Sequence, residues 1–461
     1  MSKSSTFDQL NLRKELLKNL SDLNYKTMTP IQQAALPEIL AHKDILAQAK
    51  TGSGKTATFG LAILNQINSK DLYAHSLIIC PTRELSEQVA KEIKKLARLI
   101  SNIRVLTLCG GVSQKHQVKS LSYGAHVIVG TPGRILKLIS EDKLKLDQIK
   151  SFILDEADKM LDMGFYVDMI KIKTSIKSPH QTMLFSATFP EEIKLLSKEV
   201  QHNAVDIKVD SVHKNSQIKQ EFFEVQDDMK KGDSILKLLW AYTPKRCLIF
   251  CKTKMTTHNL YKKLHEKGFY AAALHGDLDQ NQRTNVLTKF MNNSLTLLVS
   301  TDVAARGIDI QDLDLVINYD LPSDPEVYIH RIGRTGRAGL KGHALSLFYS
   351  KEENKLAEIE AITQSSLQKK DIHDLKQQKE LTKEPPMQTL YISGGKKNKL
   401  RPGDILGALI GEAQLEAQDV GAIDILNIVS YVAIKKESFQ KAMKGLQEGK
   451  IKNRKFKVGP A

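Results

Sequence analysis

Residues 44–56 read D-I-L-A-Q-A-K-T-G-S-G-K-T. The apolar run Ile45–Ala47 predicts a buried strand, and the glycines after it predict a tight loop that opens a helix reaching about Ile67. Glycines let backbone N–H groups approach phosphate oxygens, and a helix N-terminus favours negative charge. The stretch therefore predicts a phosphate-binding loop, although Ala49 stands where such loops usually begin with glycine. The predicted loop residues are Ala49, Lys50, Thr51, Gly52, Ser53, Gly54, Lys55 and Thr56.

Short apolar runs alternate with helical stretches on both sides of this loop. The runs are apolar on both faces, which predicts parallel strands covered by helices in a doubly wound α/β sheet. The first set of predicted strands is Ile45–Ala47, Leu77–Cys80, Val105–Leu108, His126–Val129, Phe152–Leu154 and Met183–Phe185. After a polar stretch at 211–217, a second α/β domain is predicted from Cys247–Phe250, Ala271–Leu274, Leu295–Val299, Leu315–Ile317 and Ala344–Phe348.

The last part of the chain has a different pattern. A polar segment that ends in Pro385-Pro386 predicts a linker. The residues after it predict a β-α-β-β-α-β order, typical of a small ferredoxin-like or RNA-recognition fold. The predicted elements are Thr389–Ile392, Pro402–Ala413, Val420–Leu426, Ser430–Ile434, Glu437–Gln447 and Lys455–Val458. We therefore expect domains at 1–210 and 211–368, a linker at 369–386 and a third domain at 387–461.

The composition favours a polyanionic partner. The chain of 461 residues has a formal net charge of +16, and Lys and Arg near phosphates release condensed counterions. Residues 385–461 hold 13 Lys and Arg against 7 Asp and Glu, a net charge of +6. The four cysteines lie in apolar runs rather than in paired zinc spacings, which predicts reduced core residues. A short polar start and the absence of a long uncharged apolar run predict a cytoplasmic protein without a membrane partner.

Residues 155–158 read D-E-A-D and follow the apolar run Phe152–Leu154. Their carboxylates are thus predicted at the carboxyl edge of the first sheet, where ligands bind. Lys55 would reach the β- and γ-phosphates, and Thr56 and Asp155 would hold Mg²⁺. Glu156 would orient and deprotonate the attacking water. The tetrapeptide gains this meaning only from its pairing with the phosphate loop, because an isolated acidic run is usually a solvated helix start.

Further short motifs follow in order along the chain. They are Thr29-Pro30-Ile31-Gln32, Pro81-Thr82-Arg83-Glu84-Leu85, Gly110-Gly111, Thr131-Pro132-Gly133-Arg134, Ser186-Ala187-Thr188, Ala305-Arg306-Gly307-Ile308-Asp309 and His330-Arg331-Ile332-Gly333-Arg334-Thr335-Gly336-Arg337. With D-E-A-D, these motifs make residues 7–350 resemble the DEAD-box RNA helicases of superfamily two. The resemblance implies two tandem RecA-like domains, ATP and Mg²⁺ as cofactors, and RNA rather than DNA as the partner.

The resemblance also implies roles for single residues. Gln32 would read the adenine edge, with Tyr25 stacked on the ring and Phe7 supporting the loop. Asp309 would contact the ribose, and His330 would couple to Ser186 and Thr188. Arg334 and Arg337 would stabilise transition-state charge from the second domain, so hydrolysis would require domain closure.

The resemblance places an RNA groove across both α/β domains. Its residues would be Thr82, Arg83, Gly111, Thr131 and Arg134 in the first domain, and Thr253, Gly276, Arg283 and Thr301 in the second. Since few residues of the groove are aromatic, we expect it to grip phosphates and 2′-hydroxyls and to be blind to sequence.

The tail resembles the C-terminal domain of the DbpA-type helicases, a subgroup that binds large-subunit ribosomal RNA. The third predicted strand of this domain offers only Tyr431 for stacking, which makes base stacking on the sheet face doubtful. We instead expect RNA on two basic segments of the tail, through Lys396, Lys397, Lys399, Arg401, Lys452, Arg454 and Lys455. The alternative for these lysines is a solvated surface without a site.

The resulting hypothesis is an ATP-dependent RNA helicase that opens short duplexes during large-subunit assembly, in contact with pre-ribosomal particles. An ATP-gated RNA clamp would use the same residues, and duplex release with turnover separates the two. A DNA translocase is disfavoured by D-E-A-D and Gln32, and comparing RNA with DNA as the stimulator of ATP hydrolysis decides that point.

Overall fold

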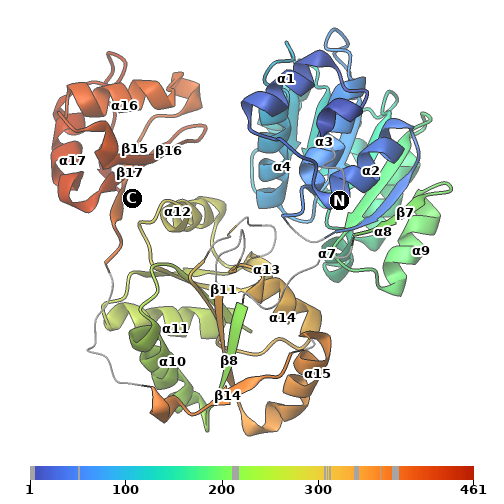
Figure 1. Ribbon diagram of the computed structural model, residues 1–461. Helices are drawn as coiled ribbons and strands as arrows, with labels where there is room; N and C mark the ends of the chain where they lie inside the picture. The colour runs from blue at the N-terminus through green and yellow to red at the C-terminus, as the bar shows by residue number, and fades with distance from the viewer. Residues whose placement is uncertain are drawn as a thin grey trace. The chain divides into compact units, whose positions relative to one another are not determined.

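The computed structural model describes residues 6–49, 52–209, 218–305, 308, 310, 313–336, 342–363, 365–375 and 384–461, without the side chains of Asp228 and Met229. The chain divides into two compact units, one of residues 1–212 with 307–309 and one of residues 213–306 with 310–461. Figure 1 shows one α/β domain in the first unit, and an α/β domain and the small C-terminal domain in the second.

The first unit contains a parallel sheet whose described strands run in the order β3-β4-β2-β5-β6-β1-β7. The strands are β1 (Ile45–Gln48), β2 (Ser76–Ile79), β3 (Val105–Leu108), β4 (Val127–Gly130), β5 (Ser151–Leu154), β6 (Gln181–Ser186) and β7 (Val205–Lys208). All the predicted strands form, and β7 is an edge strand that the sequence did not reveal. Of its four residues only Ile207 is buried, so β7 lacks the apolar run that marks a buried strand.

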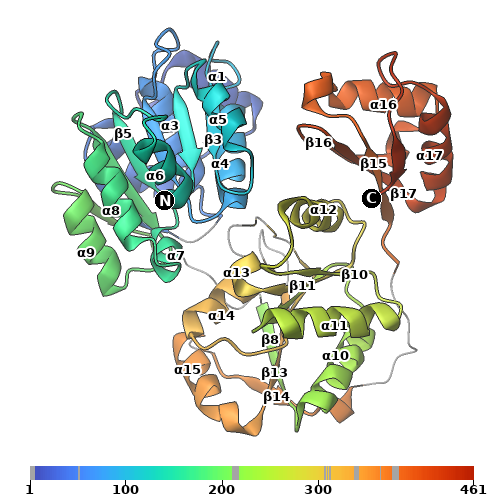
Figure 2. The same ribbon diagram turned by 180° about the vertical axis from the view of Figure 1, so that it is seen from behind.

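Helices cover both faces of this sheet. They are α1 (Lys14–Asp22), α2 (Pro30–Leu40), α3 (Lys55–Gln66), α4 (Arg83–Leu96), α5 (Gln114–Leu121), α6 (Pro132–Ser140), α7 (Ala157–Asp162), α8 (Tyr166–Ser175) and α9 (Glu191–Val200). One core joins α1 to α4 with one face of the sheet, and a second core joins α6 to α9 with the other. Figure 2 shows the face that carries α6, α8 and α9.

The amphipathic helix α4 shows why these segments are helical. Leu85, Val89, Ile93 and Leu96 recur at helical spacing and are buried against the sheet. The Thr82 hydroxyl accepts a hydrogen bond from the backbone N–H of Leu85 at 3.3 Å and caps the first turn.

The second unit repeats the arrangement, with described strands in the order β10-β11-β9-β12-β13-β8-β14, all parallel. The strands are β8 (Ile218–Glu224), β9 (Cys247–Cys251), β10 (Ala271–Leu274), β11 (Leu297–Thr301), β12 (Leu315–Asn318), β13 (Gly342–Phe348) and β14 (Gln368–Lys370). The helices are α10 (Asp228–Tyr242), α11 (Lys254–Glu266), α12 (Gln280–Met291), α13 (Asp302–Ala305), α14 (Pro325–Ile332) and α15 (Glu353–Thr363).

The second sheet extends into the segment predicted as a linker. The polar strand β14 pairs with β8, and Ile372 behind it is buried in the domain core. Both Lys370 and Lys219 form ion pairs with the buried carboxylate of Glu221. Residues 376–383 of the predicted linker lie outside the described residues.

The C-terminal domain has the predicted β-α-β-β-α-β order. Its elements are β15 (Met387–Ile392), α16 (Pro402–Gly411), β16 (Val420–Ile425), β17 (Ser430–Lys435), α17 (Phe439–Glu448) and β18 (Val458–Pro460). The sheet is antiparallel with the order β16-β17-β15-β18. The last strand was wrongly predicted at Lys455–Val458. The positive φ angles of Lys452 and Asn453 make a turn just before this segment, residues 455–457 form no strand, and pairing with Ile392 begins only at Val458.

All four cysteines are free and buried, as predicted.

Candidate active site

The phosphate loop lies at the carboxyl edge of the first sheet, between β1 and α3. Gly52 and Gly54 have φ angles of 82° and 98°, a region that glycine adopts without a steric penalty. A Cβ on Gly54 would lie 2.7 Å from Gln32 Nε2, so the loop has no room for a side chain there. Ala49, Gly52, Ser53 and Gly54 thus lead directly into the N-terminus of α3. Lys50 and Thr51 lie outside the described residues.

Lys55 and Asp155 form the charged centre of this site. Lys55 begins α3 and Asp155 follows β5, and their exposed fractions are 6% and 2%. Within the described part of the chain, neither Lys55 Nζ nor Asp155 Oδ1 has a hydrogen-bond partner. Burial raises the pKa of Asp155 to about 6, although the Lys55 ammonium acts in the opposite direction. Buried polar atoms of this kind indicate a site built for a charged ligand. Thr56, half-buried, follows Lys55 on α3.

Glu156 lies next to Asp155 in an unusual backbone conformation. Its φ and ψ angles of 54° and 50° are left-handed, which is costly for a residue with a long side chain. The carboxylate forms an ion pair with Lys159 at 2.8 Å, and both side chains are buried. The ion pair with Lys159 fixes the position of the Glu156 carboxylate next to Asp155. The sequence did not reveal the role of Lys159.

Asp158 links D-E-A-D to the Ser-Ala-Thr motif. Its Oδ2 accepts hydrogen bonds from the backbone N–H groups of Ala187 and Thr188, both at 3.2 Å, and from the Thr188 hydroxyl at 3.3 Å. The Ser186 carbonyl accepts a hydrogen bond from the N–H of Ala49 at 2.9 Å. The phosphate loop, the acidic motif and Ser186–Thr188 therefore form one connected network. The sequence predicted no role for Asp158. Its position in D-E-A-D was the feature that could have indicated one.

Gln32 contacts the phosphate loop from α2. The backbone N–H of Thr29 donates to Gln32 Oε1 at 2.9 Å, and Gln32 Nε2 donates to the Gly54 carbonyl at 3.3 Å. Tyr25 lies apart from these bonds, with its hydroxyl donating to Glu92 Oε1 at 2.9 Å. Burial, helped by this hydrogen bond, raises the pKa of Tyr25 to about 12. Phe7 is buried in the same core as Tyr25. The adenine contacts of Gln32 and Tyr25 remain predictions.

The predicted RNA residues of the first domain follow three neighbouring strands. Thr82, Gly111 and Thr131 come after β2, β3 and β4, whereas the ATP-site residues Lys55 and Asp155 come after β1 and β5. Thr82 and Thr131 stand at the N-caps of α4 and α6, and helix N-termini suit phosphate groups. The predicted RNA residues and the ATP-site residues therefore lie at the same carboxyl edge of the first sheet, but after different strands.

Two arginines belong to the predicted RNA site of the first domain. Arg134 donates to Gln117 Oε1 at 2.6 Å and to the Val112 carbonyl at 3.2 Å, which fixes the loop that carries Gly111. Arg83 pairs with Glu87 at 2.9 Å.

The second domain places its predicted RNA residues in the same way. Thr253, Gly276 and Thr301 follow or end β9, β10 and β11, the three neighbouring strands at one side of the second sheet. Arg283 on α12 donates to the Ala304 carbonyl at 3.3 Å. His330 lies on α14, and Arg334 follows that helix and is buried. Asp309 and Arg337 lie outside the described residues.

In the tail, the two predicted basic segments lie side by side. Lys452 Nζ donates to the Lys399 carbonyl at 3.0 Å and lies 3.3 Å from Asp404 Oδ2. The Phe456 ring packs so closely on Gly394 that a Cβ there would meet it at 2.4 Å. All seven predicted RNA residues of these segments are exposed, namely Lys396, Lys397, Lys399, Arg401, Lys452, Arg454 and Lys455.

The sheet face of the tail carries Tyr391 and Tyr431. Their rings pack edge to face, with 6.1 Å between the ring centroids. Thr389 on the same strand as Tyr391 is buried and hydrogen-bonded to Asn292 at 2.9 Å and to Ser294 at 2.8 Å. Side chains of the second α/β domain thus occupy part of this face, which supports RNA binding elsewhere on the tail.

Comparison with known proteins accounts for nearly the whole chain. The DEAD/DEAH box helicase family matches residues 29–196, the helicase conserved C-terminal domain matches 230–339, and the DbpA RNA binding domain matches 389–460. The ATP-dependent RNA helicase DbpA of Escherichia coli (strain K12) is 44% identical to this protein, over 98% of this chain and 99% of that relative. This chain belongs to the DEAD-box ATP-dependent RNA helicases.

The helicase is also 40% identical to the DEAD-box ATP-dependent RNA helicase CshA of Bacillus cereus, over 80% of its own length and 70% of that relative. The structure of S. cerevisiae Dbp5 bound to RNA and ADP BeF3 matches it with a TM-score of 0.74 and 34% identity, over 80% of this chain and 97% of that chain. As a member of this family, the helicase binds RNA and is an RNA-dependent ATPase.

The described residues of the helicase lack two kinds of feature. Among its described residues, no helix is long and apolar enough to cross a membrane. The same residues contain no group of three or more His, Cys, Asp or Glu side chains suited to holding a metal ion.

Proposed function

We propose that this helicase opens short RNA duplexes locally during assembly of the large ribosomal subunit, and that its tail selects large-subunit ribosomal RNA. The observation that carries the proposal is the hydrogen bond from Lys452 Nζ to the Lys399 carbonyl. It joins two basic segments, distant in sequence, into one exposed surface. Such a surface suits a folded RNA, because phosphate contacts from several directions position the partner.

Selection by the tail is needed because the motor's own RNA residues favour backbone contacts. Thr82, Thr131 and Thr253 stand at helix N-caps. Hydroxyl groups and backbone N–H groups at these positions suit phosphate oxygens, which carry no sequence information. We infer that the motor remodels whatever duplex the tail brings to it.

ATP would bind the first domain as its Mg²⁺ complex. The hard oxygen ligands that Mg²⁺ prefers are offered by Thr56 and by Asp155, whose Oδ1 is buried and has no partner within the described residues. The ion would supply charge neutralisation at the phosphates. Lys55 would bind the β- and γ-phosphates, and Glu156 would orient the attacking water and accept its proton. The strained backbone and the Lys159 ion pair support this fixed position of Glu156.

The remaining ATP-site residues complete this proposal. Gln32, Tyr25 and Asp309 would hold the nucleoside, while Arg334 and Arg337 would stabilise charge in the transition state. His330, Ser186 and Thr188 would couple hydrolysis to RNA, and the hydrogen bonds of Asp158 to Thr188 support that coupling.

A strand-release assay tests the proposal with the intact protein. The same short labelled duplex is joined either to a large-subunit ribosomal RNA fragment or to an unrelated structured RNA. We expect ATP-dependent release to be faster on the ribosomal fragment, and the double variant Arg454→Gln/Lys455→Gln to remove this preference. The matched control is Lys441→Gln/Lys444→Gln on α17, which removes equal charge from exposed positions outside the basic surface.

Two outcomes would contradict the proposal. ATP-dependent retention of RNA without strand release would favour an ATP-gated clamp. Equal loss of preference in both double variants would show that net charge, rather than the surface around Lys399 and Lys452, selects the RNA.

A further inference from the structure

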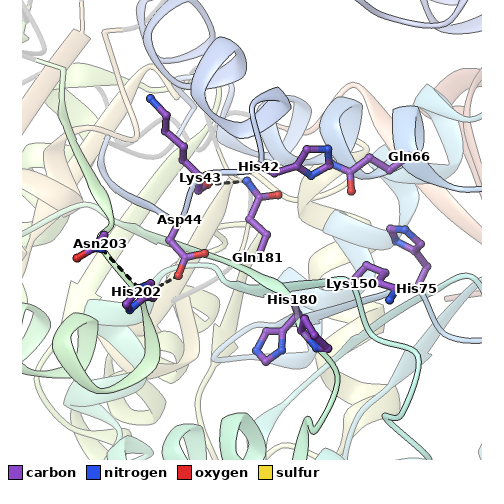
Figure 3. A pocket seen from close by; sticks show the side chains of 11 residues that line it. His42, Lys43, Asp44, Gln66, His75, Lys150, His180, Gln181, His202 and Asn203 are labelled. Atoms are coloured by element: carbon purple, nitrogen blue, oxygen red, sulfur yellow. Dashed lines mark hydrogen bonds between the residues drawn. The ribbon is translucent and has the colours of Figure 1, made fainter.

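A cleft of about 830 Å³ lies at the amino edge of the first sheet, opposite the edge that carries Lys55 and Asp155. Its volume is in the range of small-molecule sites. Segments that lead into four strands line it, through Asp44 before β1, His75 before β2, Lys150 before β5 and His180 before β6 (Figure 3). The cleft shares no lining residue with the predicted ATP and RNA sites, so helicase activity does not explain it.

One wall of the cleft carries two oriented hydrogen-bond acceptors. Gln181 Nε2 donates to the carbonyls of Ile39 at 3.0 Å and Lys43 at 2.6 Å, which fixes Oε1 as the remaining acceptor. The Nδ1 of His180 lies 2.6 Å from the Ser178 carbonyl. A carbonyl only accepts, so Nδ1 carries the proton and Nε2 is an acceptor.

Both acceptors are buried, and neither Gln181 Oε1 nor His180 Nε2 has a hydrogen-bond partner among the described residues. Gln181 as a whole is only 6% exposed. Buried acceptors are costly when they stay unpaired, so these two indicate a polar partner that donates hydrogen bonds.

The cleft also offers donors and positive charge. The buried Nε2 of Gln66 has no acceptor within the described part of the chain. Figure 3 shows Lys150 beside His75, with Gln66 and His42 near them. Lys150 is exposed, and burial together with its ammonium lowers the pKa of His75 to about 4. The imidazole of His75 is therefore neutral near pH 7, and Lys150 supplies a cation for an anionic ligand.

Simpler ligands leave part of this wall unused. The described residues offer no cluster of three metal-ligating side chains, which excludes a metal site built from them. Inorganic phosphate would suit Lys150 and Gln66 as an acceptor, but its dianion has a single hydroxyl donor for the two acceptors of Gln181 and His180. A nucleotide satisfies both groups, because its phosphate accepts hydrogen bonds and an exocyclic amino group on its base donates them.

We propose that the cleft of Gln66, Lys150, His180 and Gln181 binds a nucleotide with an amino-bearing base, either free or within an RNA strand. Its phosphate would face Lys150 and Gln66, and the amino group would face Gln181 Oε1 and His180 Nε2. The site lies on the edge of the sheet away from the phosphate loop, so it would be filled independently of ATP.

Titration calorimetry of the intact protein with cytidine monophosphate tests this proposal. Cytosine carries an amino group, and its use avoids competition for a site that selects adenine. We expect one saturable site that Lys150→Gln and His180→Phe each weaken by about tenfold. His180→Phe keeps a ring against Phe152, whose centroid is 6.5 Å from that of His180. The control Lys177→Gln, at an exposed lysine outside the lining, should leave the affinity unchanged.

Competition experiments identify which chemical groups the cleft recognises. Uridine monophosphate, which lacks the amino group, should bind more weakly, and a tetracytidylate that competes would assign the site to RNA rather than to free nucleotides. Competition by inorganic phosphate or uridine monophosphate as strong as that by cytidine monophosphate would overturn the proposal. So would binding that stays unsaturated at about 10 mM, or that survives Lys150→Gln. Since Lys150 is exposed, this variant remains informative even if His180→Phe destabilises the domain.

Discussion

Asp158 accepts hydrogen bonds from both the backbone N–H and the hydroxyl of Thr188, at 3.2 and 3.3 Å. Asp158 lies two residues after Glu156, in the first turn of the helix α7 that begins within D-E-A-D, and Thr188 lies in the loop after β6. A movement of the Ser186–Thr188 segment must therefore either carry Asp158 with it or break these bonds. This relationship gives the predicted coupling between hydrolysis and RNA a physical connection.

Asp158→Ala should uncouple strand release from ATP hydrolysis and lower the stability of the first domain. The substitution leaves the N–H groups of Ala187 and Thr188 without their acceptor, which costs about 1–3 kcal/mol for a buried group. We expect strand release to fall further than ATP hydrolysis, measured side by side on one RNA duplex. Asp147→Ala, at an exposed position of the same domain, is the control. Equal losses of both activities would instead indicate a purely structural role.

Lys55→Ala and Glu156→Gln should each abolish RNA-stimulated ATP hydrolysis while the fold survives. Lys55 Nζ has no hydrogen-bond partner within the described residues, so its removal breaks no such bond. Glu156→Gln should still bind ATP, because it changes the group that acts on water rather than on the phosphates. Phosphate release and binding of a fluorescent ATP analogue measure the two effects. Wild-type turnover in either variant would show that the site is misassigned.

Arg337→Ala should lower the turnover number by roughly a thousandfold with little change in ATP affinity. An arginine that acts on charge developing in the transition state affects chemistry more than binding. Single-turnover hydrolysis measures the rate of the chemical step, and nucleotide titration measures the affinity for ATP. Weakened binding with normal turnover at saturation would identify Arg337 as a ground-state contact.

The stability of the first domain should depend on pH through His75. Burial lowers its pKa from 6.5 to about 4 in the folded protein, so the unfolded chain binds more protons between these values. Stability should then rise with pH across this window, by at most about 1.4 kcal/mol per pH unit, and be lost as pH falls. Urea unfolding of His75→Asn at pH 5 and 7 should show a smaller difference than the native protein. His116→Asn, at an exposed site on α5, should keep the native difference.

A truncation that ends near Glu384 should keep ATP hydrolysis with generic RNA at high concentration and lose its preference for ribosomal RNA. The motor residues remain, but the basic surface around Lys399 and Lys452 is removed. The cut also removes Thr389, the hydrogen-bond partner of Asn292 and Ser294, so the thermal midpoint should be compared as well. Unchanged discrimination between ribosomal and unrelated RNA in the folded truncation would place specificity in the motor domains.

Much of the fold could be predicted because its signals are local. The β1 strand, the glycine loop and α3 follow one another within residues 44–66, and buried parallel strands such as β2 and β5 are apolar on both faces. Edge strands lack this signal, since they pair on one side and can be polar. The strand β14 of Gln368–Lys370 was therefore missed, and it depends on pairing with β8 and on the ion pair from Lys370 to Glu221.

The sequence by itself determined the phosphate loop, D-E-A-D and the motif set, because each is a short run of residues with fixed spacing. Only the tertiary structure decided which of these runs touch one another. The bonds between Asp158 and Thr188 span 30 residues, and the contact between Lys452 and Lys399 spans 53. The cleft of Gln66, Lys150 and His180 exists only because parallel strands bring their amino ends to a single edge. No local sequence pattern predicts such contacts between distant residues, because they depend on the order in which the strands pair.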